Sequence, residues 1–194
     1  MTRSDYRPDK RGLTIFLTGL PAAGKSTIAS FLRVRLMEMA TPSVHLLDGD
    51  DLRKSLSSDL GFSREDRNEN IRRIGDALAE VTRSGGIAIC AAIAPYDVSR
   101  KAVRQVIAAV GGFLLVYIST PAKVCEARDP KGEYTRARAG LLAHFTGVSD
   151  PYEPPDDAEV VIDTTTTSVG AAAEIIVGRL RAEGYLPMFK QATR

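Results

Sequence analysis

Residues 13–27 read LTIFLTGLPAAGKST, an apolar run followed by a loop that fits the phosphate-loop pattern G-x-x-x-x-G-K-[ST] at every fixed position. The two glycines let the backbone fold around an anion, so that successive N–H groups point at phosphates. Because strand, loop and helix follow in the order that this mechanism requires, a mere glycine turn with a solvated Lys25 is the weaker interpretation. We expect phosphate contacts from the loop and the start of the next helix, Ser26 being also the Mg²⁺ ligand: Gly19, Leu20, Pro21, Ala22, Ala23, Gly24, Lys25, Ser26 and Thr27.

The composition favours one compact domain. The chain has 194 residues, of which 44% are hydrophobic, enough to bury a full core. Its net charge of +2 gives no general electrostatic case for nucleic acid or a membrane as partner. Cys90 and Cys125 form no C-x-x-C or Cys/His cluster, so we expect buried thiols and neither a disulfide nor a zinc site. No apolar run is long enough for a signal peptide or a membrane span, and a cytoplasmic location is expected.

Apolar runs alternate with amphipathic stretches along the chain, the order typical of a parallel sheet covered by helices. We expect strands near 13–18, 44–47, 87–93, 113–118 and 159–162, and helices over 26–40, 63–83 and 98–109, after Pro121 and from Ser168. The fold predicted is α/β: a three-layer α/β/α arrangement of the P-loop NTPase type, with a central parallel sheet and a lid segment.

The predicted domain covers residues 12–186, between a polar tail or linker at 1–11 and a C-terminal tail at 187–194. Residues 129–157 combine turn residues, basic side chains and one aromatic segment, and they fit neither a helix nor a strand. A connection of that length is usually functional, so we expect a lid; the alternative is a disordered surface loop.

Carboxylates follow the second predicted strand, where Asp48, Asp50 and Asp51 stand in the segment LDGDD. The carboxyl end of that strand faces the same rim as the phosphate loop. A carboxylate there can accept the proton of an attacking hydroxyl or hold water on Mg²⁺. We assign this chemistry to Asp50, although such residues also cap helices, the role we expect for Asp51.

A polar segment at 60–74 begins the next helix. On a helix starting near Arg64, Arg67 and Asn70 share one face. An arginine fork suits phosphate or sulfate oxygens, and an amide can donate and accept. The other charged residues of this stretch are interpreted as a solvated face.

These segments together resemble the adenylylsulfate kinase (APS kinase) family. The resemblance runs from about residue 12 to 164 and rests on the phosphate loop with TGL at 18–20, LDGD at 47–50, LGFS at 60–63 with Asp66, Arg67 and Asn70, APY at 94–96, VCEARDPKG at 124–132, FTG at 145–147 and DPYE at 150–153. A phosphate loop alone is shared by many enzyme classes, whereas this ordered set is specific.

The resemblance implies an ATP- and Mg²⁺-dependent kinase acting on the ribose 3′-hydroxyl of adenosine 5′-phosphosulfate (APS). It assigns Lys25 and Asp50 to catalysis, with Asp50 as the base. The other roles it implies are phosphosulfate binding for Arg53, Arg67 and Asn70, a sandwich of the substrate adenine for Phe62 and Phe145, a place on the substrate side of the lid for Lys131, and contact with the adenine of ATP for Arg128. It also implies a homodimer and admits a fusion or association with ATP sulfurylase.

The chain departs from the family pattern at several positions. Pro21 and Ala22 stand where many members have Ser or Thr and Gly, and Ala94 and Asp97 replace the Ser and Arg of Ser-Pro-Tyr-Arg. The lid reads TRAR at 135–138 and AHFTG at 143–147, where lysines are usual. Two alternatives stay open at this point: a kinase of the same fold for another small hydroxyl substrate, and a catalytically weak nucleotide-binding or regulatory domain of a sulfate-activating complex.

Overall fold

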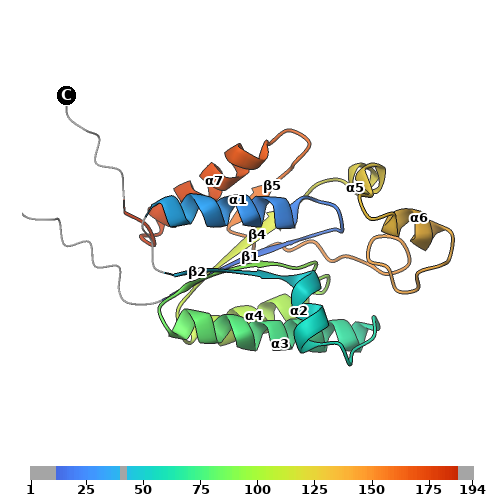
Figure 1. Cartoon of the computed structure of the whole chain (residues 1–194), viewed down its shortest axis with the longest axis horizontal. Helices are drawn as coiled ribbons and strands as arrows, with labels where there is room; N and C mark the ends of the chain where they lie inside the picture. The colour runs from blue at the N-terminus through green and yellow to red at the C-terminus, as the bar shows by residue number, and fades with distance from the viewer. Residues whose placement is uncertain (1–11, 40–42, 188–194) are drawn as a thin grey trace, which may run out of the picture.

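A computed structural model describes residues 12–39 and 43–187, and both predicted tails lie outside these ranges apart from residue 187. Five parallel strands form one sheet in the order β2-β3-β1-β4-β5 (Figure 1). The strands confirm the predicted positions to within a few residues: β1 Leu13–Gly19, β2 Val44–Asp48, β3 Ile87–Ala91, β4 Gly112–Ile118 and β5 Val160–Ile162. The strand that precedes the phosphate loop therefore lies at the centre of the sheet, between β3 and β4.

Helices cover both faces of the sheet, which confirms the predicted three layers. α1 (Lys25–Glu38) and α7 (Val169–Ala182) pack together on one face, and α3 (Arg64–Arg83) and α4 (Asp97–Ala108) on the other (Figure 1). Alternate residues of β1 supply the two cores, since Ile15 belongs to the cluster under α1 and α7 while Phe16 belongs to the cluster under α3 and α4. A central parallel strand is buried on both sides, so every residue of β1 is buried.

The predicted helix starts are confirmed by their caps. The Ser63 hydroxyl accepts the Asp66 N–H at the start of α3, and the Ser168 hydroxyl accepts the Ala171 N–H at the start of α7. α1 begins after Gly24, whose left-handed φ of 106° turns the chain from the loop into the helix.

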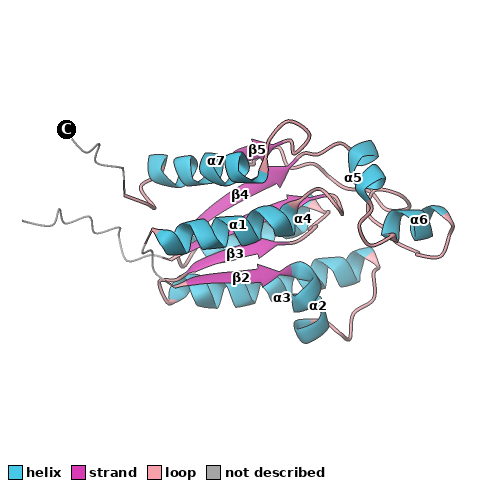
Figure 2. Ribbon diagram, turned by 45° about the horizontal axis from the view of Figure 1, so that its top comes forward, coloured by secondary structure: helices cyan, strands magenta, loops and turns pink. Residues whose placement is uncertain are grey.

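Three short helices lie near the carboxyl ends of the strands (Figure 2). They are α2 (Gly49–Leu56), α5 (Ala122–Arg128) and α6 (Glu133–Arg138). Helix α6 lies inside the predicted lid, whose backbone is anchored by Glu153 N–H donating to Pro95 O at 2.8 Å. The alternative of a disordered loop at 129–157 is therefore wrong.

Cys90 and Cys125 are buried free thiols, as expected. Burial raises the pKa of both, so they are inert at neutral pH. Among the helices of the described ranges, none is both long enough and apolar enough to cross a bilayer.

Candidate active site

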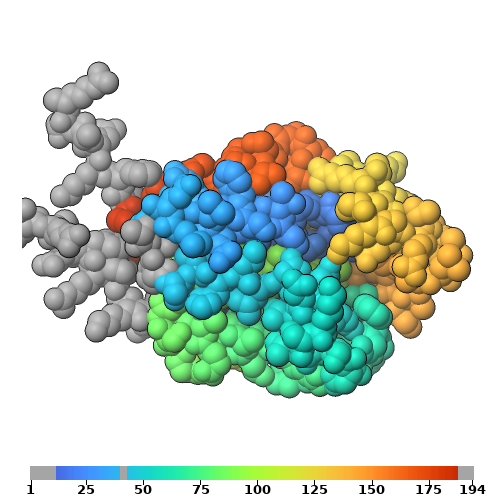
Figure 3. All heavy atoms as spheres, in the orientation of Figure 1, coloured from blue at the N-terminus to red at the C-terminus, as the bar shows by residue number. Residues whose placement is uncertain are grey.

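A cavity of about 490 Å³ opens at the carboxyl edge of the sheet. Its walls come from the phosphate loop, the start of α2, the start of α3 and the first part of the lid. In the space-filling view the yellow and orange lid atoms lie at this same end, beside the blue of α1 and the teal of α2 and α3 (Figure 3). The predicted site residues that line it are Pro21, Ala22, Gly24, Lys25, Ser26, Thr27, Asp50, Arg53, Phe62, Arg67, Asn70, Arg128 and Lys131, whereas Gly19, Leu20, Ala23 and Phe145 are not in its lining.

The carbonyl groups of the phosphate loop all accept hydrogen bonds. Lys25 Nζ donates to Gly19 O at 2.9 Å and to Leu20 O at 2.7 Å, and the hydroxyls of Thr120 and Thr164 both donate to Ala23 O at 3.1 Å. The remaining loop carbonyls, at positions 21, 22 and 24, accept from Tyr134, Arg128 and Ile28. The Ala23 N–H donates to Leu20 O at 3.2 Å, and Pro21 has no N–H. The N–H groups at the start of α1 have no carbonyl one turn earlier in the helix, so they can bind an anion.

Lys25 is buried in the loop and its ammonium faces only carbonyl oxygens there. Desolvation by burial is the main reason why its pKa falls from 10.5 to about 8, although the nearby carboxylates Asp50 and Asp48 act to raise it. A phosphate oxygen would supply a negative charge next to the ammonium and so offset the loss of water that burial causes. This arrangement favours an anionic ligand at the loop.

Asp48 caps α2, because its Oδ1 accepts the Asp50 N–H at 3.0 Å. Its other oxygen, Oδ2, accepts the Ser26 hydroxyl at 2.6 Å. The expectation that Asp51 caps this helix is wrong: Asp51 lies in the first turn and pairs with Lys54. Since Asp48 does the capping, the Asp50 carboxylate is free of that role.

Asp50 forms an ion pair with Lys131, which comes from the lid. Both side chains are about 60% exposed (63% and 61%), so the pair adds little to stability. The hydrogen bond to Asp50 is the main cause that raises the pKa of Lys131. Lys131 of the lid is thus the direct ion-pair partner of Asp50, the carboxylate to which the sequence analysis assigned the chemistry.

Two arginines form a cationic wall opposite the loop. Arg67 donates to the carbonyls of Phe62 and His144, and Arg53 donates to Gly61 O. Within residues 12–39 and 43–187, neither guanidinium forms an ion pair with a carboxylate. Burial lowers the pKa of both, as expected for cations held away from water without a counter-ion.

Phe62 lies between these cations, with its ring centroid 4.3 Å from the Arg53 guanidinium carbon and 5.5 Å from that of Arg67. Phe62 is 53% exposed as a residue and lines the cavity, so it offers apolar surface there. Asn70 is buried nearby in the lining, and its Oδ1 has no hydrogen-bond partner in the described structure. A buried amide oxygen without a partner is costly, and a ligand donor would relieve that cost.

Phe145 lies in a different setting. Its ring meets that of Tyr134 edge-on, with centroids 5.0 Å apart, and it packs against the core cluster under α1 and α7. The structure thus places Phe62 on the cavity wall and Phe145 against the core. The adenine sandwich stays a prediction, and Phe145 would have to offer a ring face that the cavity lining does not now include.

Arg128 ends α5 at the edge of the loop. Its Nη1 donates to the Thr164 hydroxyl at 2.8 Å and its Nη2 to the Thr164 carbonyl at 3.1 Å. Since Thr164 also holds Ala23 O, Arg128 is positioned against the loop from outside. A planar guanidinium in the cavity lining can stack on a base.

The departures at 94–97 have unequal consequences. Ala94 lines the cavity, so its missing hydroxyl concerns the site directly. Asp97 is not in the lining; it pairs with Lys101 at 2.6 Å and Arg100 at 3.4 Å. The reversed charge at 97 is therefore neutralised within α4.

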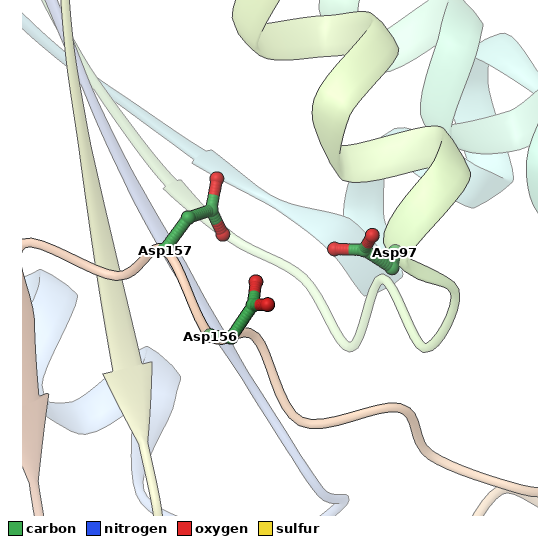
Figure 4. A group of neighbouring side chains, drawn as sticks. All are labelled: Asp97, Asp156 and Asp157. Carbon is green, nitrogen blue, oxygen red and sulfur yellow. The ribbon is translucent and has the colours of Figure 1, made fainter.

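Asp97 also lies near Asp156 and Asp157 (Figure 4). Their carboxylate oxygens lie within 4.8 Å of one another, and the described part of the chain offers no other such acidic group. Lys101 and Arg104 already pair with Asp97 and Asp157. The group is thus compensated by protein cations and is not in the cavity lining, unlike the Ser26 hydroxyl predicted to bind Mg²⁺.

Three contributors to the site escape sequence reasoning. Tyr134, Thr120 and Thr164 each hold a loop carbonyl, although they lie far from the loop in sequence. Thr120 and Thr164 follow the ends of β4 and β5, and that position on the active rim is the signal that would have found them. Tyr134 carries no such signal.

Comparisons with known proteins bear on this geometry. A family model described as adenylylsulphate kinase matches residues 11–163. The adenylyl-sulfate kinase of Synechococcus sp. (strain JA-3-3Ab) is 47% identical over 177 residues, which are 91% of this chain and 98% of that protein. A sulfate adenylyltransferase of Emericella nidulans is 48% identical over 176 residues, 90% of this chain but 31% of that longer protein. The solved Mycobacterium tuberculosis APS kinase in complex with AMPPNP and APS has a TM-score of 0.84 and 37% identity, covering 88% of this chain and 98% of that one.

Proposed function

This chain belongs to the adenylylsulphate kinase family, and on that premise we propose that it transfers the γ-phosphoryl group of ATP to the 3′-hydroxyl of APS, giving 3′-phosphoadenosine 5′-phosphosulfate. The related Mycobacterium tuberculosis kinase was solved with both an ATP analogue and APS. Here the loop would hold the ATP phosphates and the opposite wall of the cavity would hold APS.

The observation that carries the proposal is the wall formed by Arg53, Phe62 and Arg67. Neither guanidinium pairs with a carboxylate in the part of the chain that the structure describes, and arginine forks match the oxygens of a phosphosulfate. The exposed ring between them suits a base, since its flat face can stack. A ligand that is both doubly anionic and aromatic fits this wall better than a neutral sugar does.

Asp50 and Lys25 carry the chemical step in this proposal. Asp50 would accept the proton of the 3′-hydroxyl, as an exposed carboxylate on the rim of the cavity. Lys25 would balance the charge that develops on the β and γ oxygens. Lys131 would release Asp50 and turn to the substrate as APS enters, since the pair it forms with Asp50 is exposed and weak.

The residues at the loop fit Mg²⁺. The Ser26 hydroxyl and the Asp48 carboxylate lie 2.6 Å apart beside the phosphate position, and hard oxygen donors are the ligands that this ion prefers. Ser26 would bind the ion directly and Asp48 would hold its water. The ion supplies charge neutralisation of the phosphates when bound.

Further proposals concern the setting of the reaction. Arg128 would stack on the adenine of ATP, and Phe62 with Phe145 on that of APS. We also propose a homodimer, on the family resemblance, and a cytoplasmic location. Because the chain spans about a third of the Emericella nidulans sulfate adenylyltransferase, association with or fusion to such a partner is also proposed.

Thermal protection tests the substrate assignment. A ligand that binds the folded state alone must raise the melting temperature, by an amount set by its concentration relative to Kd. With ADP and Mg²⁺ present, we expect APS to raise it further, whereas shikimate, gluconate and AMP do not. An Arg67→Gln variant should lose the increment from APS and keep that from ADP. Protection by another acceptor, but not by APS, would overturn the proposal.

A further inference from the structure

Helix α6 of the lid touches the phosphate loop through Tyr134. This side chain is 1% exposed, and its hydroxyl donates to the Pro21 carbonyl oxygen at 3.2 Å. The Asp129 carboxylate fixes the first turn of α6 by accepting the N–H groups of Tyr134 and Thr135, both at 2.9 Å. The position of Tyr134 is therefore determined by the lid, and its hydroxyl acts on the loop.

The carbonyl that Tyr134 holds belongs to an unusual peptide unit. Pro21 has no N–H, so the donors of this part of the loop begin with Ala22. Ala22 has φ of 59°, a left-handed conformation that costs an L-residue about 1–2 kcal/mol. The described structure has no cis peptide bond, so the Pro21 carbonyl and the Ala22 N–H point in opposite directions. Whatever fixes the carbonyl also aims the N–H.

We propose that Tyr134 is a positioning residue, which holds the Pro21–Ala22 peptide of the phosphate loop in its anion-binding orientation and thereby couples lid docking to ATP binding. Docking of α6 orients the Ala22 N–H for a phosphate oxygen. By reciprocity, a nucleotide on the loop stabilises the docked lid by the same free energy. The inference rests on the proposed function only in taking the loop as the nucleotide site, and it makes no use of the acceptor.

The surroundings of Tyr134 support a donor role. Desolvation raises the pKa of its phenol, so the hydroxyl stays protonated across the working pH range. Its ring is held edge-on by Phe145, 5.0 Å away between centroids. Replacement by Phe would keep that ring contact and remove the donor alone. The Pro21 carbonyl would then lack the hydrogen bond that holds the strained conformation at Ala22 in place.

The test is the affinity of the Tyr134→Phe variant for ADP with Mg²⁺, measured by calorimetry without APS. Loss of one hydrogen bond that acts on the site predicts binding about 3- to 10-fold weaker. Tyr185→Phe is the matched control. Tyr185 lies beside Gly112, the first residue of β4, whereas the cavity lies at the carboxyl ends of the strands. The control should bind ADP as the parent does.

A second readout separates positioning from stability. ADP should slow tryptic cleavage at the exposed Arg136 in the parent, and less so in Tyr134→Phe, because the coupling is lost. A lower melting temperature with unchanged ADP affinity and unchanged protection would show a purely structural tyrosine and overturn the proposal. If the parent itself fails to bind ADP, the nucleotide site is refuted; if it binds ADP but does not use APS, only the acceptor assignment falls.

Discussion

The phosphate loop and the lid both line one cavity, but they are built in different ways. The loop joins a fully buried central strand to a helix, and Lys25, Thr120 and Thr164 hold its carbonyls from the core side. The lid meets the loop and its rim through a few single side chains, among them Tyr134 and Lys131. One wall is preformed, and the other is held by contacts that a ligand can exchange.

This difference indicates a division of labour. The part of the loop that Lys25, Thr120 and Thr164 hold needs no reorganisation when phosphates bind, which is what electrostatic stabilisation of a transition state requires. The Lys131–Asp50 pair of the lid is exposed, so it can be exchanged for contacts with a ligand at small cost. Changes on the fixed wall should therefore alter turnover, whereas changes on the lid should alter affinity.

The largest effect is expected at Asp50, where the two walls meet. Asp50→Asn should lower kcat by about 10²–10⁴-fold, because the amide cannot accept the substrate proton. Stability should hardly change, since Asp48 provides the helix cap and the pair with Lys131 is exposed. Steady-state kinetics and thermal melts measure the two quantities.

Asp51→Asn is the matched control, because Asp51 is exposed one residue further on and is not in the cavity lining. It should keep parental kcat. Full turnover in Asp50→Asn would contradict the role of Asp50 as the base. Early melting with turnover retained would in addition show that Asp50 is structural.

A lid change should have a smaller effect, in KM. Lys131→Gln removes the cation that would follow the incoming substrate, and loss of one charge-assisted hydrogen bond predicts a KM for APS about 10-fold higher with kcat nearly unchanged. Lys123→Gln, an exposed lysine on α5, serves as control and should leave KM unaltered. A loss of kcat in Lys131→Gln as large as the rise in KM would place Lys131 in the chemical step. It would contradict the assignment of turnover to the loop and of affinity to the lid.

The fixed wall should also show a pH signature. Because burial lowers the pKa of Lys25 to about 8 and a phosphate favours the ammonium, ADP binding should take up a proton above pH 8 and weaken by up to about 10-fold per pH unit. Calorimetry in buffers of different ionisation enthalpy measures this uptake. Lys25→Ala should abolish it, and uptake that persists there would assign it to another group.

The lowered pKa of Lys25 affects stability in the opposite direction: ADP binding weakens as the pH rises, whereas the folded protein becomes more stable. Between about pH 8 and 10.5 the unfolded chain keeps a proton on Lys25 that the ligand-free folded protein has lost, so this group makes the free energy of unfolding rise with pH in that window. Lys25→Ala should remove that part of the slope in denaturant titrations.

The smallest effect is expected from restoring glycine in the loop. Ala22→Gly relieves a left-handed strain of about 1–2 kcal/mol and loses about 0.5–1 kcal/mol to unfolded-state entropy, a net gain of about 0–1.5 kcal/mol. Ala102→Gly, at an exposed position inside α4, should instead lose about 1 kcal/mol. Destabilisation by Ala22→Gly would mean that the loop is unstrained there.

The same contrast explains what the sequence could predict. The strand, loop and helix over residues 13–38 follow from a local pattern, and so do the remaining strands. Helix α6 was not predicted because it has only six residues and its first N–H groups are held by Asp129 outside it. The contacts that complete the site, Tyr134 with Pro21 and Lys131 with Asp50, join residues 113 and 81 positions apart, and no local pattern carries such a pairing.

The most direct test of the central claim is product analysis after incubation of the protein with ATP, Mg²⁺ and APS, with shikimate, gluconate and AMP as parallel acceptors. We expect ADP and 3′-phosphoadenosine 5′-phosphosulfate in equal amounts, with no phosphorylation of the other acceptors. Phosphorylation of another acceptor but not of APS would contradict it, and so would an absence of transfer by protein that binds both nucleotides.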